Sequence, residues 1–217
     1  MRYSPEFLAS VEAMAASYHA ALTPDTQAFG YLADRGIDQG AIDRYRLGVV
    51  TAEHDEHSKF EGMISIPYIT KLAGPVSLKF RVAHACTEFC GHSKYIGPYE
   101  TRLYNTIAME DADRLGYVGL LEGEVNALTL DHLCGIPAVG IPGAEAWKAH
   151  PEWKELFKGY GKVLCFPDND EAGERLAAGI GRDIDTLKIV RFPQGSDANK
   201  AFTEIGASEI RRIAGVS

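Results

Sequence analysis

The chain has 217 residues, 46% of them hydrophobic, so it can bury one good core or two small ones. Its net charge of −8 argues against a general nucleic-acid coat protein, which would be basic. No apolar stretch approaches membrane-spanning length, and the N-terminus lacks the layout of a signal peptide. The four cysteines form no secreted disulfide framework, and Cys134 and Cys165 fit reduced core residues. These features predict a cytoplasmic protein with no membrane partner.

The first half of the chain is predicted to form a small α+β subdomain over residues 1–115. Residues 1–47 are expected to be helical, because Phe7, Val11 and Met14 share one apolar face and Thr23-Pro24 is typical of a helix start. Residues 48–105 are expected to form antiparallel strands separated by turns. A charged, helical connector at 106–116 marks the expected domain boundary.

The second half, residues 116–217, is predicted to be a parallel sheet flanked by helices. Apolar runs at 117–121, 162–166 and 186–193 have the composition of strands, and helical patterns follow the first two. A final helix is expected at about 207–214, with Ile210 and Ile213 as packing positions. Strands that alternate with helices are the signature of an α/β fold.

Acidic side chains follow each of these strands. Glu122 ends the first, Asp168 and Asp170 follow the second, and Asp197 follows the third. The carboxyl ends of parallel strands gather at one edge of a sheet, so these acids should converge there. Crowded carboxylates stay ionised cheaply only around a cation, and oxygen ligands suit Mg²⁺ or Mn²⁺. A simpler alternative for Asp170 is that it caps the helix beginning at Glu171.

This order of acidic strand ends resembles the TOPRIM domain of bacterial-type primases, topoisomerases and some nucleases. The matching segments are Glu122-Gly123, Asp168-x-Asp170 with Ala172-Gly173, and Gly195-Ser196-Asp197-x-Asn199. Upstream segments are similar to the RNA-polymerase domain of DnaG-type primases: Tyr31-Leu32-x-x-Arg35-Gly36-Ile37, Arg46-Leu47-Gly48, Met63 to Tyr68, Val76 to Arg81, Lys94 to Thr101 and Leu103-Tyr104-Asn105. The resemblance spans about residues 28–203, and compact bacteriophage primases are the expected relatives.

The resemblance implies a DNA primase core, a DNA-directed RNA polymerase that makes short RNA primers on single-stranded DNA. Nucleotidyl transfer of this kind uses two metal ions to neutralise charge on the attacking and leaving oxygens. The resemblance assigns metal binding to Glu122, Asp168, Asp170 and Asp197 and catalysis to the first three. Glu122 could instead take the proton of the attacking 3′-hydroxyl. Asn126 and Asn199 stand where the family often has acids, so the second metal is expected to bind weakly or together with nucleotide phosphates.

Basic residues between Lys59 and Arg102 outnumber acidic residues by six to three, which predicts a positive patch in an acidic chain. The resemblance assigns contacts with nucleic acid or nucleotide to Lys79, Arg81, Lys94 and Asn199. Lys79 and Arg81 should share one strand face, because their side chains are two residues apart. Solvated strand-end charges are the alternative.

A second group of possible ligands, His84, Cys86, Cys90 and His92, could bind zinc. The spacing matches no standard zinc finger, and a reduced loop is the simpler interpretation. No zinc ribbon is recognised before residue 20 and no helicase-binding domain after residue 205. We therefore expect DNA template and NTPs as ligands, and a separate helicase or zinc-domain chain as partner, in the host cytoplasm if a phage encodes the chain.

Two other functions remain open on sequence grounds. RecR-type recombination mediators are also short and pair a cysteine-rich zinc element with a TOPRIM domain that clamps DNA without catalysis. A small TOPRIM nuclease would use the same metals with water as the nucleophile, and the sequence separates it least well from a primase. A topoisomerase is disfavoured, because no separate domain presents a nucleophilic tyrosine.

Overall fold

The structure is a computed structural model that describes residues 3–84, 95–97, 101–193 and 196–216. The chain forms two compact units, residues 1–100 and 101–217. The first is α+β and the second is a parallel sheet flanked by helices, which confirms the predicted fold class. The units divide before the boundary expected at residues 115 and 116, because the connector helix belongs to the core of the second unit. Within the described ranges, every helix is too short or too polar to cross a membrane.

The first unit begins with helices and continues as an antiparallel sheet. Its elements are α1 (Pro5–Ala21), α2 (Gln27–Ala33), α3 (Gln39–Tyr45), β1 (Gly48–Val49), the 3-10 helix η1 (Asp55–Phe60), β2 (Ile64–Thr70), β3 (Gly74–Arg81) and β4 (Tyr95–Ile96). The strands pair in sequence order, all antiparallel. The expected helix start at Thr23 was wrong. Thr26 caps α2 by accepting a hydrogen bond from the Phe29 amide, and Thr23 precedes a turn.

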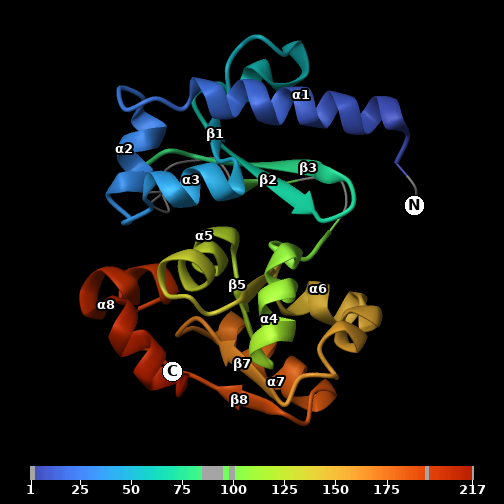
Figure 1. Cartoon of the computed structure of the whole chain (residues 1–217), viewed down its shortest axis with the longest axis vertical. Helices are drawn as coiled ribbons and strands as arrows, with labels where there is room; N and C mark the ends of the chain where they lie inside the picture. Colours follow the sequence, from blue (N-terminus) through green and yellow to red (C-terminus); the bar gives the residue numbers. More distant parts are fainter. Residues whose placement is uncertain (1–2, 85–94, 98–100, 194–195, 217) are drawn as a thin grey trace. The chain divides into compact units, whose positions relative to one another are not determined.

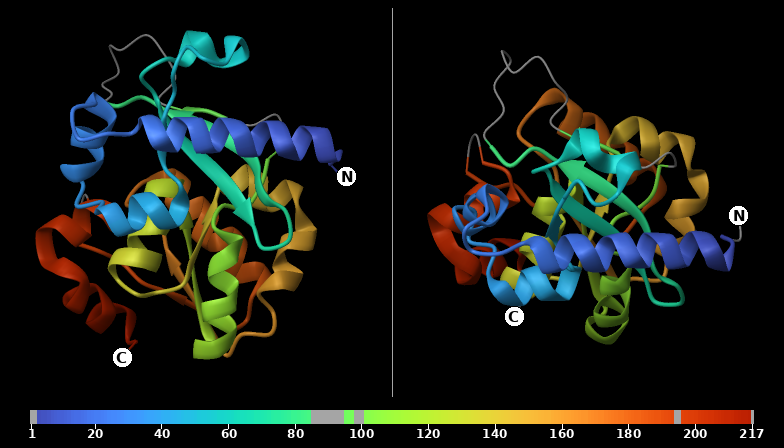
Figure 2. Two further views of the ribbon diagram at one scale, coloured as in Figure 1. Left: turned by 45° about the horizontal axis from the view of Figure 1, so that its top comes forward. Right: turned by 90° about the horizontal axis from the view of Figure 1, so that it is seen from above.

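Helix α1 lies across this sheet and supplies one side of its core (Figure 2). Its apolar residues, including Val11 and Tyr18, pack on Leu78 and Phe80 of β3. The approach is closest at Gly48, where an added Cβ would lie 2.5 Å from the Tyr18 carbonyl carbon. A side chain at that position would push α1 off β1.

The second unit alternates strands and helices. Its elements are η2 (Thr106–Ala108), α4 (Met109–Leu115), β5 (Tyr117–Glu122), α5 (Glu124–Leu128), the π-helical η3 (Thr129–Leu133), β6 (Ala138–Ile141), α6 (Ala144–Ala149), η4 (Pro151–Leu156), β7 (Lys162–Phe166), α7 (Glu171–Asp183), β8 (Leu187–Ile189) and α8 (Ala198–Ala214). The order across the sheet is β6-β5-β7-β8, and all three pairings are parallel (Figure 1). Helix α8 begins earlier than the sequence predicted, and Gly206 kinks it at a φ of 76°.

Helices cover both faces of the parallel sheet. On one face, Val118, Leu120, Val163 and Cys165 pack with apolar residues from α4, α6, η4 and α7. On the other, α5 packs on β5 and β6 and contacts α8. With both faces covered, the open sites of this unit lie at the ends of the strands and between helices.

The two cysteines that the structure describes are free thiols inside the second unit, as the sequence predicted. Burial raises the pKa of both Cys134 and Cys165 to about 12. Because the thiolate is the reactive form, we expect neither to react with a thiol reagent at pH 8 in the native state. Mass spectrometry after alkylation, with and without urea, checks this. Rapid native labelling of either residue would mean that the core opens.

Candidate active site

The acids at 122 and 168 lie at the same edge of the parallel sheet. Strand β5 pairs with β7 with Leu121 opposite Phe166, so Glu122 ends one strand beside the point where the other ends. Asp168 follows β7 after Pro167, and Glu122 and Asp168 are both half-buried. The sequence-based expectation that these two strand ends meet at one edge is confirmed.

A close backbone approach fixes the loop that carries Asp168. Gly173, in the first turn of α7, lies against this loop, and an added Cβ would sit 2.2 Å from the Asp168 carbonyl oxygen. No side chain fits in that space. The glycine of the Ala172-Gly173 pair therefore lets the chain fold back tightly after β7 and place Asp168 beside the helix start.

Asp170 and Asp197 both cap helices. Oδ1 of Asp170 accepts a hydrogen bond from the Gly173 amide at 2.8 Å, and Oδ1 of Asp197 accepts one from the Lys200 amide at 2.8 Å. The simpler interpretation of Asp170 as an N-cap is therefore confirmed, and Asp197 has the same role. Both side chains are exposed, so capping holds each carboxylate at the helix start and occupies only one of its oxygens.

Asn169, between the two aspartates, joins two acidic loops. Its Nδ2 donates to the carbonyl oxygens of Pro193 at 3.2 Å and Ser196 at 3.3 Å. Ser196 is buried and its hydroxyl donates to Glu204 of α8 at 2.8 Å. This link holds the loop after β7 against the segment that leads into Asp197. No role for Asn169 is predicted from sequence, because an asparagine between two aspartates has the composition of an ordinary turn.

Loss of this amide should loosen the edge. We expect Asn169→Ala to lower the free energy of unfolding by about 1 kcal/mol, because two partly exposed hydrogen bonds are lost. We expect Asn169→Asp, which keeps the shape but cannot donate, to cost as much or more, since it adds another negative charge. Urea unfolding measures both, with Thr203→Ala on the outer surface of α8 as control. An unchanged midpoint in both variants would contradict the link.

Asn126 and Asn199 tie β5 to α8. Nδ2 of Asn126 donates to the Glu122 backbone carbonyl at 3.2 Å, and its Oδ1 accepts a hydrogen bond from the backbone N–H of Asn199 at 3.2 Å. Asn199 is 7% exposed, and its Nδ2 donates to the Thr129 hydroxyl at 3.0 Å. The side chain of Asn199 therefore lies in the packing between α8 and η3, and its contact with nucleic acid stays a prediction. The two amides join Glu122 to the helix that Asp197 begins.

The donors at this edge have the chemistry that a hard divalent cation requires. Glu122, Asp168, Asp170 and Asp197 offer only oxygen, with no cysteine or histidine among them. In the described parts of the chain, no three acidic, cysteine or histidine side chains are grouped closely enough to hold an ion. The carboxylates would have to turn towards one another to share one. The donor types fit Mg²⁺ or Mn²⁺, and a bound ion stays a prediction.

In the first unit, Lys79 and Arg81 share one face of β3, as predicted. Lys79 Nζ lies 4.7 Å and Arg81 Cζ 4.8 Å from the centre of the Tyr95 ring. Arg81 is only 3% exposed, and its guanidinium donates to the hydroxyl groups of Tyr31 and Tyr95. The two tyrosines thus enclose the charge of Arg81, and Lys79 is the more accessible cation. Contact of Arg81 with nucleic acid stays a prediction.

The remaining predicted ligands fall largely outside the described residues. Lys94, Cys86, Cys90 and His92 lie in the segment 85–94, which is outside the described residues. The contact of Lys94 with nucleic acid or nucleotide and the zinc site therefore stay predictions. His84, just before this segment, is exposed.

Comparison with known proteins identifies the fold. No family model matches the chain. The Gene 57 protein of Mycobacterium phage D29 is 41% identical over 105 residues, which are 48% of this chain and 66% of that protein, just under two thirds of its length.

Among solved structures, the RNA polymerase domain of Mycobacterium tuberculosis primase DnaG has a TM-score of 0.78 at 19% identity, over 99% of this chain and 84% of that one. The zinc-binding and RNA polymerase domains of Aquifex aeolicus primase give 0.80 at 18% identity, over 99% and 62%. A DnaG primase catalytic domain bound to single-stranded DNA gives 0.72 at 18% identity, over 96% and 78%. Both units of this chain thus have the fold that the sequence resemblance implied.

Proposed function

We propose that this chain, which has the fold of the DnaG primase catalytic core, is a metal-dependent nucleotidyltransferase that makes short RNA primers on single-stranded DNA. The main support is that this fold extends over nearly the whole chain while acidic residues follow three strand ends in the order of the TOPRIM pattern. A fold alone does not determine an activity, so the proposal depends on the acidic residues at the edge of the parallel sheet.

The acidic edge supplies the groups that nucleotidyl transfer needs. Asp168 and Asp170 after β7 and Asp197 before α8 would hold divalent cations, with Glu122 as a further ligand or as the group that accepts the proton of the attacking 3′-hydroxyl. Bound cations would neutralise charge on the phosphates of the incoming nucleotide. Capping holds Asp170 and Asp197 at the starts of α7 and α8, and the amide of Asn169 links the two loops that carry them.

The first unit would contribute phosphate contacts. Lys79 offers a point charge beside the Tyr95 ring, and Arg81 would act through the tyrosine hydroxyls that it holds. We assign Arg81 the role of a positioning residue. Lys94 keeps its proposed role as a second cation on the adjoining segment.

The ligands we propose are a single-stranded DNA template and NTPs, with a separate helicase or zinc-domain chain as partner. The match to a phage protein favours a role in phage DNA replication.

A direct assay tests the proposal. Purified protein is incubated with single-stranded template and labelled NTPs, with Mg²⁺, Mn²⁺ or EDTA. We expect metal-dependent RNA of a few nucleotides. Template cleavage without synthesis would make the protein a TOPRIM nuclease, and tight DNA binding with neither activity would make it a non-catalytic mediator. Either result overturns the proposal.

A further inference from the structure

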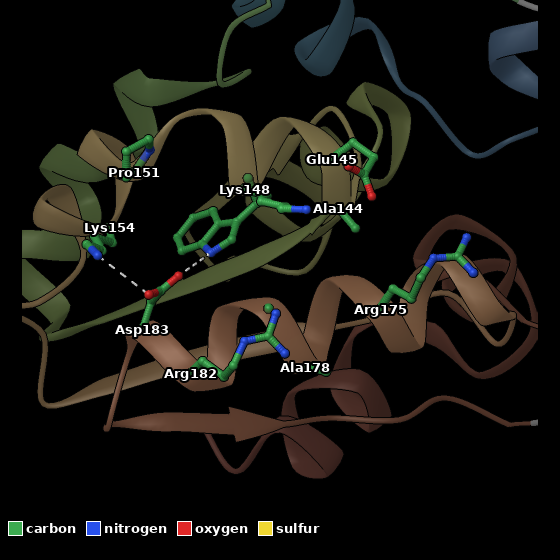
Figure 3. Close-up of a pocket in the computed structure, with 11 residues that line it drawn as sticks. Ala144, Glu145, Lys148, Pro151, Lys154, Arg175, Ala178, Arg182 and Asp183 are labelled. Carbon is green, nitrogen blue, oxygen red and sulfur yellow. Dashed lines mark hydrogen bonds and ion pairs between the residues drawn. The ribbon is translucent and has the colours of Figure 1, made fainter.

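A basic groove lies in the second unit, with α6 and η4 on one side and α7 on the other. It encloses about 480 Å³. The charged side chains that line it are Lys148, Lys154, Arg175, Arg182, Glu145 and Asp183 (Figure 3). Four cations against two acids make this groove positive within a chain of net charge −8. None of these residues belongs to the acidic edge or to the cations on β3.

The contacts inside the groove leave part of its positive charge unpaired. Asp183 accepts a hydrogen bond from the Trp147 indole at 2.9 Å and lies 3.6 Å from Lys154, and Arg175 pairs with Glu171 at 3.0 Å. Lys148 and Arg182 are exposed and form no ion pair with any residue that the structure describes. Two cations are therefore open to an anion from outside.

Small side chains keep the groove open. Ala178 and Gly179 line it on α7, opposite the buried Trp147. An added Cβ on Gly179 would lie 3.6 Å from Trp147 Cδ1, so a larger side chain there would begin to fill the space.

Both walls of the groove start at the acidic edge. Helix α6 begins directly after Gly143, where an added Cβ would be 3.6 Å from Glu122 Oε1. Helix α7 begins directly after Asp170. The groove therefore leads away from the carboxylates along the helix layer.

We propose that this groove binds the phosphate backbone of a single-stranded nucleic acid. Arg175 and Arg182 are two helical turns apart, about 10.5 Å along α7, which suits phosphates spaced along a strand better than one compact triphosphate. Arginine and lysine are the usual partners of phosphate oxygens. The inference rests on the proposed function in that a priming enzyme must hold a strand beside its acidic edge.

Binding measured without catalysis tests the inference separately. Fluorescent dT₁₂ is titrated in EDTA, without NTPs, over a range of salt concentrations. We expect Lys148→Gln/Arg182→Gln to weaken binding roughly tenfold at low salt and to flatten the salt dependence by about 1.4 in log–log slope, since each single-strand phosphate contact contributes about 0.7. The control Arg114→Gln/Lys158→Gln removes two ion-paired surface cations outside the groove and should bind as wild type does.

The NMR signal of a tryptophan in the groove shows directly whether nucleic acid is bound there. The chain has two tryptophans, and Trp147 lines the groove with its indole N–H donating to Asp183. We expect dT₁₂, and not ATP at equal phosphate concentration, to shift its NMR signal, and the double variant to abolish the shift. If the two double variants lose dT₁₂ binding equally, or if ATP without dT₁₂ shifts the Trp147 signal, the inference is overturned. Strand binding through the groove without primer synthesis would overturn the proposed function and leave this inference intact.

Discussion

Replacement of Asp168 by alanine is expected to reduce primer synthesis roughly a thousandfold, equivalent to about 4 kcal/mol of transition-state stabilisation. The residue is half-buried at the edge where β5 and β7 end, and Gly173 holds its backbone against α7. No other described side chain on this loop is both acidic and half-buried, so none can replace it. Steady-state synthesis on a single-stranded template measures the loss.

Two further measurements separate metal binding from folding. Mn²⁺ binding followed by electron paramagnetic resonance should weaken in Asp168→Ala, and the urea midpoint shows whether the variant is folded. Asp185→Ala, an exposed acid before β8, is the matched control and should keep full activity. Wild-type synthesis by Asp168→Ala would remove the acidic edge from the mechanism. Unchanged Mn²⁺ affinity would place the ion elsewhere.

The sequence predicted the sheet well because its signals are local. An apolar run followed by acidic residues marks both β5 and β7, and parallel pairing then brings Glu122 and Asp168 to one edge. For the same reason, the prediction that Lys79 and Arg81 share one face of β3 is confirmed, since side chains two residues apart on a strand point to the same side.

The contacts that organise the edge are not local and could not be predicted from the sequence. Asn169 reaches carbonyls more than twenty residues away, and Asn126 meets Asn199 on another helix. The enclosure of Arg81 by Tyr31 likewise joins residues 50 positions apart. From residue type alone, the arginine is predicted to be accessible to a ligand and the asparagines to be ordinary turn residues. Only the packed fold shows which of them have internal partners.

The largest stability effect is expected at Gly173. Its replacement by alanine would place a Cβ 2.2 Å from the Asp168 carbonyl oxygen and 2.7 Å from the Asp168 nitrogen, so the loop must move. Backbone cannot yield as a flexible side chain does, and we expect the free energy of unfolding to fall by about 3 kcal/mol. Synthesis should fall with it, because the displaced segment carries Asp168.

Gly181→Ala in the same helix is the matched control. An added Cβ there meets only Leu187 Cδ2 at 3.5 Å, an ordinary contact, and alanine is the better helix former. We expect a gain of about 0.5–1 kcal/mol, read from the same urea titration. If Gly173→Ala unfolded at the same urea concentration as Gly181→Ala, the tight return after β7 would not exist, and Asp168 would lack the backbone support on which its proposed role depends.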